Sequence, residues 1–151
     1  MSRLIPLLVL TIVLSATGCG IGGEETPGAQ PTKVTFVRKA DAICAKAYKQ
    51  IESGFKSFVG SAGREPFSNI EEIQKFADTV LIPVRQKEVE ELGAVGAPRE
   101  DEDRVRAILE AYEEGIEKAE ESARNAVLSS AGVFVKATEL AEEYGLKECR
   151  H

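Results

Sequence analysis

The expected fold class follows from one stretch, VTFVRKADAICAKAYKQIESGFKSF, which spans residues 34–58. Its apolar residues recur every three or four positions: Phe36, Ala40, Ile43, Cys44, Ala47, Ile51, Phe55 and Phe58. Its basic residues fall on the opposite face: Arg38, Lys39, Lys46, Lys49 and Lys56. This spacing predicts an amphipathic helix with one buried face. We expect Thr35 to be its N-cap and residues 60–63, Gly-Ser-Ala-Gly, to end it.

A second helix is expected to begin at the capping box of residues 68–71, Ser-Asn-Ile-Glu. Ser68 is the expected N-cap, and Glu71 is expected to bond back to it. Pro83 lies inside this helix, where it has no N–H to donate and crowds the carbonyl of Thr79. The sequence therefore predicts a kink or a break at Pro83.

Two more helices follow a turn at residues 92–98, Leu-Gly-Ala-Val-Gly-Ala-Pro. Pro98 suits the first position of the third helix, which is expected to continue to residues 129–130. The fourth helix is expected over residues 131–144. Gly145 is its expected left-handed cap, and Leu146 is expected to pack back on Leu140 or Ala141. Four amphipathic helices on short connections, with no strand pattern, predict an all-α, antiparallel four-helix bundle.

The N-terminus has the character of an export signal. Arg3 precedes the uncharged residues 4–14, LIPLLVLTIVL, a run that is too short to span a bilayer. Residues 15–19, SATGC, resemble the lipobox of bacterial lipoproteins, in which the signal is cut before the Cys and the thiol carries diacylglycerol. Residues 1–18 are therefore expected to be a lipoprotein signal peptide and Cys19 the lipidation site. Ordinary secretion is the alternative, because Ala16 and Gly18 also fit a small-x-small cleavage site.

Residues 20–33, GIGGEETPGAQPTK, are too polar and too rich in Gly and Pro to bury a core. Cys19 and this segment, residues 19–33, are expected to be a flexible tether that reaches roughly 20 Å, followed by a helical domain over residues 34–151. Without residues 1–18 the chain has 18 Lys and Arg against 25 Asp and Glu. Such a chain should repel anionic headgroups, so the lipid is expected to hold it on the membrane. The formal net charge of −6 argues against a nucleic-acid partner.

The three cysteines need an explanation, because three is an odd number. A lipid on Cys19 leaves Cys44, on the apolar face of the first helix, and Cys149, in the C-terminal tail. Exported proteins with two remaining cysteines usually pair them. Two separate buried thiols are an alternative, and a metal or redox pair is a rarer one.

The chain offers little for catalysis or cofactor binding. Its single His, His151, stands at the last position, which disfavours His-based catalysis and His-ligated metals. The acidic residues at 100–103 and 113–121 are interpreted as solvated helix faces rather than calcium sites. We therefore expect no metal and no cofactor. Gly54 and Gly115 lie inside expected helices and indicate a close helix crossing, a small cavity or tolerated surface positions.

Three motifs together resemble a group of small helical lipoproteins of the actinobacterial type. They are ADAICA at residues 40–45, the Leu-to-Pro joint at residues 92–98, and YGL followed by Cys149 at residues 144–149. The resemblance covers about residues 34–149. It implies a lipid-anchored helical domain in which Cys44 is joined to Cys149, and it implies no activity or ligand.

Three functional hypotheses follow from these features. The first is a non-enzymatic lipoprotein, held on the outer side of the bacterial cell membrane, that binds an envelope protein or polymer. The second is a carrier of a small apolar ligand, bound in a pocket between helices. The third is an enzyme, which would need a perturbed carboxylate or Lys in a cleft.

Overall fold

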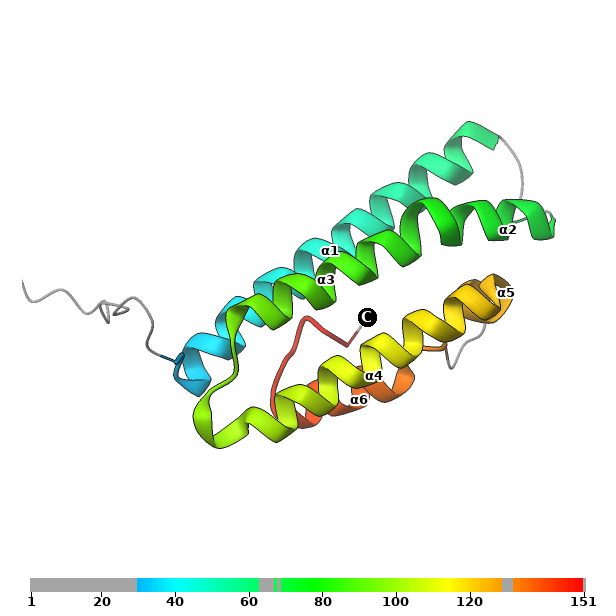
Figure 1. Ribbon diagram of the computed structural model, residues 1–151. Helices are drawn as coiled ribbons and strands as arrows, with labels where there is room; N and C mark the ends of the chain where they lie inside the picture. Colours follow the sequence, from blue (N-terminus) through cyan, green and yellow to red (C-terminus); the bar gives the residue numbers. More distant parts are fainter. Residues whose placement is uncertain (1–29, 63–66, 68, 129–131, 151) are drawn as a thin grey trace, which may run out of the picture.

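The computed structural model describes residues 30–62, 67, 69–128 and 132–150, and over these residues it contains helices and no strand (Figure 1). The elements in chain order are α1 (Lys33–Ala62), α2 (Ile70–Phe76), the π-helix η1 (Ala77–Leu81), α3 (Ile82–Val95), the 3-10 helix η2 (Arg99–Asp101), α4 (Glu102–Glu121), α5 (Ala123–Leu128) and α6 (Val135–Tyr144). The expected all-α class is confirmed.

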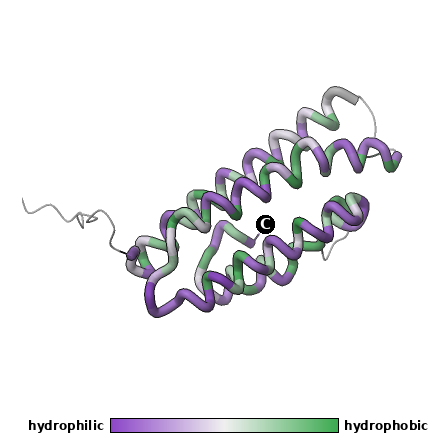
Figure 2. Tube along the Cα trace, in the orientation of Figure 1, coloured by the Kyte–Doolittle hydropathy of each residue, from purple (hydrophilic) through white to green (hydrophobic). Residues whose placement is uncertain are grey.

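The helices lie in two layers. α1 runs beside α3, while α4 runs beside α6 in the second layer, and the C-terminal segment passes between the layers (Figure 1). α3 and α4 pack on each other and join the layers. Hydrophobic and hydrophilic residues alternate along each helix (Figure 2), as expected of helices that bury one face. The largest side chains that are almost fully buried belong to Phe36, Leu92, Tyr112 and Leu146.

α1 begins earlier than the sequence predicted. It starts at Lys33, and the Thr32 hydroxyl accepts a 3.3 Å hydrogen bond from the backbone N–H of Thr35. Thr35 therefore lies in the first turn, and its expected role as N-cap is wrong. Two threonines spaced by three residues offer two possible starts, and the chain uses the first. The apolar face is placed as predicted, because Phe36 and Ala40 are buried.

We call each of the four long helical segments a helical arm: α1, then α2 with η1 and α3, then η2 with α4 and α5, and last α6. The second helical arm contains the distortion expected at Pro83. Asn69, and not Ser68, caps its start, because the Asn69 side chain accepts a 3.0 Å hydrogen bond from the N–H of Glu72. Ser68 itself lies outside the described residues. The helix widens over η1, where the N–H of Ile82 bonds to the carbonyl of Ala77. Pro83 lies two residues after the end of this π-helical segment, so the widened turn precedes a residue with no N–H.

The joint between α3 and α4 differs from the expected turn in two details. α3 continues through Leu92 to Val95, and Gly96 then adopts a positive φ of 74°. Pro98 stands just before the helical turn η2, and its carbonyl accepts a 2.9 Å bond from the N–H of Asp101. Pro98 therefore caps the next helical arm from outside and does not occupy its first position.

The last two helical arms include one break that was not predicted. The expected third helix is divided at Ser122, whose φ of −150° and ψ of 89° end α4 before α5 begins. α6 begins at Val135 rather than at residue 131; residues 129–131 lie outside the described residues. Its end is as predicted. Gly145 is left-handed at φ 109°, and the N–H of Leu146 bonds to the carbonyl of Ala141 at 2.9 Å.

Candidate functional site

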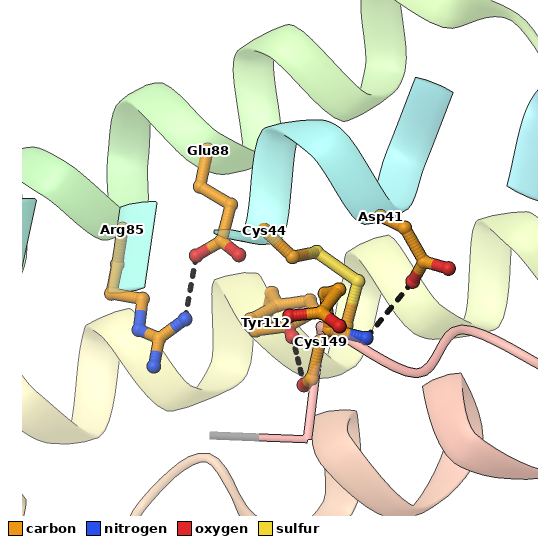
Figure 3. Close-up of a disulfide and its surroundings, with 7 residues drawn as sticks. Asp41, Cys44, Arg85, Glu88, Tyr112 and Cys149 are labelled. Atoms are coloured by element: carbon orange, nitrogen blue, oxygen red, sulfur yellow. Dashed lines mark hydrogen bonds and ion pairs between the residues drawn. A yellow bond between two sulfur atoms is a disulfide. The ribbon is translucent and has the colours of Figure 1, made fainter. Parts of the chain in front are cut away.

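The centre of the molecule is built around the disulfide between Cys44 in α1 and Cys149 in the C-terminal tail (Figure 3). The two residues are 105 positions apart in sequence, and their Cα atoms are 4.9 Å apart. The predicted pairing is confirmed, which removes the alternative of two separate thiols. Because both cysteines are buried, the bond holds the tail inside the molecule.

Two hydrogen bonds fix the tail on either side of the disulfide (Figure 3). The backbone N–H of Glu148 donates to the Asp41 carboxylate in α1 at 3.0 Å. The hydroxyl of Tyr112 in α4 donates to the main-chain oxygen of Cys149, also at 3.0 Å. Each layer therefore makes one of these hydrogen bonds to the tail. The tail occupies the space between the layers as a fifth packing element.

A buried ion pair lies beside this tail. Arg85 and Glu88, both in α3, are only 6% and 2% exposed, and the Arg85 guanidinium donates to the Glu88 carboxylate at 2.6 Å. The guanidinium also lies over two rings, 5.1 Å from the centroid of Phe134 and 5.9 Å from that of Tyr112. Stacking on aromatic faces suits Arg in an interior position, because its charge is spread over a flat group.

Burial governs the electrostatics of this cluster. It raises the pKa of Glu88, and the neighbouring Arg85 only partly offsets that effect. Among the described residues, the second carboxylate oxygen of Glu88 has no hydrogen-bond partner. Burial, together with the Glu88 charge, also raises the pKa of Tyr112. The Tyr112 hydroxyl therefore keeps its proton at neutral pH and remains a donor to Cys149.

The sequence contains a signal for this ion pair. The apolar face of the second helical arm steps from Leu81 through Val84 to Leu92, and a core-facing position is due near residue 88. The residue there is Glu88, with Arg85 three positions earlier on the same face. A charged residue in a core position that has an opposite charge at i−3 is a candidate for a buried pair.

An apolar groove opens on the surface between α1, η1 and α5. It encloses about 270 Å³ and is lined by Tyr48, Ile51, Glu52, Phe55, Phe67, Phe76, Leu81, Ala126 and Val127. Phe67 contacts Phe55, Phe58 and Phe76 with ring centroids 5.4–5.8 Å apart. Its backbone has a positive φ of 59°, which is unfavourable for a bulky residue, so the aromatic contacts hold it in place.

The two glycines that the sequence singled out mark places where another part of the chain packs closely on a helix: Gly54 faces η1, and Gly115 faces the segment before α6. A Cβ added to Gly54 would lie 2.5 Å from Cγ1 of Val80, and one added to Gly115 would lie 2.5 Å from Cδ1 of Phe134. Neither position is a cavity, and neither is a tolerated surface position. Each glycine lets a neighbouring side chain approach the helix backbone.

The acidic residues of α4 are solvated, as expected, and Glu114 forms the best-defined ion pairs among them. It accepts hydrogen bonds from Lys118 at 2.7 Å and from Lys136 in α6 at 2.8 Å. These bonds lower the pKa of Glu114 to about 2. The expected lipidation site Cys19, the signal peptide and His151 lie outside the described residues.

The described residues include no group of three or more His, Cys, Asp and Glu that could hold a metal ion. None of the helices described here combines the length and the apolar character that crossing a bilayer requires. Comparison with protein-family models, curated proteins and solved structures finds no match. The function has to be inferred from the chain's own residues.

Proposed function

We propose that the chain is an exported lipoprotein, anchored by Cys19 to the bacterial cell membrane, whose helical domain binds an envelope protein or polymer without catalysis. The disulfide carries this proposal. It uses Cys44 and Cys149, which leaves Cys19 as the one cysteine of the three that remains for a lipid. The position of Cys19, after a charged residue, an apolar run and small residues, is where such a lipid is attached.

The compartment and the spacing agree with this proposal. Disulfides persist in oxidising compartments and are rare in the cytosol, so a buried disulfide supports export. α1 begins at Lys33, 14 positions after Cys19, which leaves enough chain to separate a lipid from a folded domain. We further infer that the four helical arms form an antiparallel four-helix bundle. The packing of α1 on α3, α3 on α4 and α4 on α6 supports this topology.

Replacing Cys19 tests the anchor. The Cys19→Ser variant should leave the membrane fraction or accumulate as an uncut precursor. The matched control is the Cys44→Ser, Cys149→Ser double variant, which should stay in the membrane fraction because its lipid is unchanged. Intact mass spectrometry of the membrane-purified protein should show an acylated Cys19 as the first residue. An unmodified Cys19 thiol in that material would overturn the proposal.

Transport of a small apolar ligand is the second candidate function, and the groove beside Phe55 favours it. The lining residues belong mainly to the apolar and aromatic types that such sites use. The volume of about 270 Å³ lies just below the usual range of roughly 300–1,000 Å³, so only a small ligand or one end of a chain would fit.

A groove-filling variant separates the two functions. Ala126 lines the groove, whereas Ala94 is an exposed residue of α3 far from it in sequence and outside its lining. Ala126→Trp should abolish binding of an uncharged naphthylamine dye, while Ala94→Trp should leave binding unchanged. Failure of the unaltered protein to bind the dye, or equal binding by both variants, would remove the carrier function.

A further inference from the structure

Charge is distributed unequally between the two layers. α1 contains six basic residues and two acidic ones, although the whole chain has a formal charge of −6. α4, in the other layer, contains eight acidic residues and three basic ones. The first layer therefore contains a basic helix, and the second contains an acidic one.

Three of the exposed cations of α1 lie on one straight line along the helix, which we call the basic ridge: Arg38, Lys49 and Lys56. Successive α-helical residues turn by about 100°, so these three side chains leave the helix within about 20° of one another. Buried Ala47 points in the opposite direction, toward the core. The ridge spans 18 residues, which corresponds to about 27 Å along the helix axis.

Small residues keep the cations of the ridge accessible. An open, shallow depression on this face of α1 is lined by Ala42, Ala45, Lys46, Lys49, Gln50 and Ser53. Arg38 and Lys49 form no ion pair with any part of the chain that the structure describes. Among the described residues, Lys56 pairs only with exposed Glu52 one turn away, and such a contact contributes little and is screened by salt.

We propose that the basic ridge docks on anionic lipid headgroups, so that the anchored domain lies with α1 along the membrane surface. The proposal rests on the lipid anchor at Cys19, because the tether holds the N-terminal end of α1 near the bilayer. Val34, 79% exposed, lies one turn before Arg38 and about 40° around the helix from it. An apolar residue beside cations is typical of a helix that contacts a membrane interface.

The negative charge of the whole domain does not prevent this docking. Charges in physiological salt are screened beyond about 8 Å. With α1 against the headgroups, the acidic outer faces of α4 and α6 lie one further layer away, about 20 Å or two helix diameters. The membrane therefore interacts with the ridge and hardly with the acidic layer. A straight face about 27 Å long also suits a flat surface better than the curved contour of a protein partner.

Amine labelling of the reconstituted lipoprotein tests the orientation. The full mature protein is placed in vesicles of phosphatidylcholine alone or of phosphatidylcholine mixed with phosphatidylglycerol. Modification of Lys49 and Lys56 is then compared with that of Lys118 in α4 by mass spectrometry. We expect labelling of the two ridge lysines to fall severalfold in the anionic vesicles and to recover at high salt, while Lys118 stays unchanged.

A pair of charge reversals supplies the matched control. Lys49→Glu removes a ridge cation, and Arg124→Glu makes the same change of net charge on exposed α5. One basic residue near an anionic surface changes the equilibrium constant for docking about fivefold. Lys49→Glu should therefore restore labelling of Lys56 in anionic vesicles, whereas Arg124→Glu should leave both ridge lysines protected.

Several outcomes would overturn the docking. Equal labelling in both kinds of vesicle, with the protein still sedimenting with them, would contradict docking through the ridge but not the lipid anchor. A protein that sediments with neither kind of vesicle would contradict both the lipid anchor and the docking. Protection of Lys49 in the native envelope but not in anionic vesicles would assign the ridge to a macromolecular polyanion instead of lipid.

Discussion

The hydroxyl of Tyr112 lies 3.0 Å from the main-chain oxygen of Cys149 and donates a hydrogen bond to it. Tyr112 belongs to α4, while Cys149 is joined through its sulfur to α1, so this one residue of the tail is bound to both layers. The tail is therefore part of the core and not an appendage.

Removal of the Tyr112 hydroxyl should reduce stability measurably. Tyr112→Phe leaves the buried carbonyl of Cys149 without its donor, which should lower the free energy of unfolding by about 1–3 kcal/mol. Tyr144→Phe is the comparison, because its hydroxyl bonds to Asp101 in a partly buried position and its loss should cost less. Urea denaturation followed by circular dichroism measures both. A larger loss in Tyr144→Phe would contradict the assignment.

The disulfide should contribute a large share of the stability of the domain. Cys44→Ser and Cys149→Ser should each lower the free energy of unfolding by roughly 2–5 kcal/mol, because the closed loop restricts the unfolded chain. The two losses should be equal, and the double variant should add nothing further. Strongly unequal single variants would show that the cysteines have separate roles.

The buried ion pair should respond differently to one substitution than to two. Glu88→Gln removes the carboxylate charge that pairs with the buried Arg85 guanidinium and should cost about 3–5 kcal/mol. The double variant Arg85→Met, Glu88→Leu removes both desolvated charges, and its stability should equal or exceed that of the unaltered protein by up to about 4 kcal/mol. Thermal unfolding of Glu88→Gln, of Arg85→Met and of the double variant measures these changes in stability. A double variant that is less stable than the unaltered protein would show that the pair is a net stabiliser.

The two classes of helical glycine should give opposite results. Gly115→Ala brings a Cβ within 2.5 Å of the Phe134 ring and within 3.1 Å of the Val133 carbonyl, so it should destabilise the domain. Gly93→Ala meets nothing within 4 Å in α3 and should stabilise it by up to about 1 kcal/mol. Denaturation midpoints measure both changes. Stabilisation by Gly115→Ala would mean that α4 and the segment before α6 are not closely packed.

The ion pairs of Glu114 should appear in the pH dependence of stability. Because its pKa is lowered from 4.5 to about 2 in the folded state, its contribution is present above pH 4.5 and is lost as pH falls toward 2. The stability difference between the unaltered protein and Glu114→Gln should therefore shrink over that interval. The matched control is Glu113→Gln, which removes an exposed carboxylate of the same helix that forms no ion pair with the described residues. A difference that stays constant down to pH 2 would contradict the shift.

Local patterns predicted the all-helical class, the disulfide and the end of α6. Helix periodicity and the cap at Gly145 depend on residues that are neighbours in the sequence. Cys44 could be placed because it lies on a clear apolar face of the first helix. The break at Ser122 left no such signal, because the apolar positions Ala119, Ala123 and Ala126 continue through it without interruption. The hydroxyl of Ser122 accepts a 3.4 Å bond from the N–H of Asn125, which starts a new helix where the pattern predicted a continuous one.

The central cluster was predicted only in part, for a physical reason. Arg85 and Glu88 become a buried pair because the Phe134 and Tyr112 rings, from other parts of the chain, surround the guanidinium. Their partners depend on tertiary packing and not on spacing along one helix. The direction of the tail after Gly145 likewise depends on the space that the two layers leave between them.

The insertion of the tail sets the order in which the protein can be completed. A chain that emerges with its N-terminus first exposes Cys44 long before Cys149, 105 positions later, can reach it. Until then the helices of the two layers can form and pair, but the space between them has no occupant and Cys44 has no partner. Closure of the interior is therefore a late, slow event on the folding pathway, set by loop formation and thiol oxidation rather than by helix growth. A nascent chain interrupted before Cys149 would be helical, reduced and open at its centre, and therefore easy for a protease to distinguish from the finished protein.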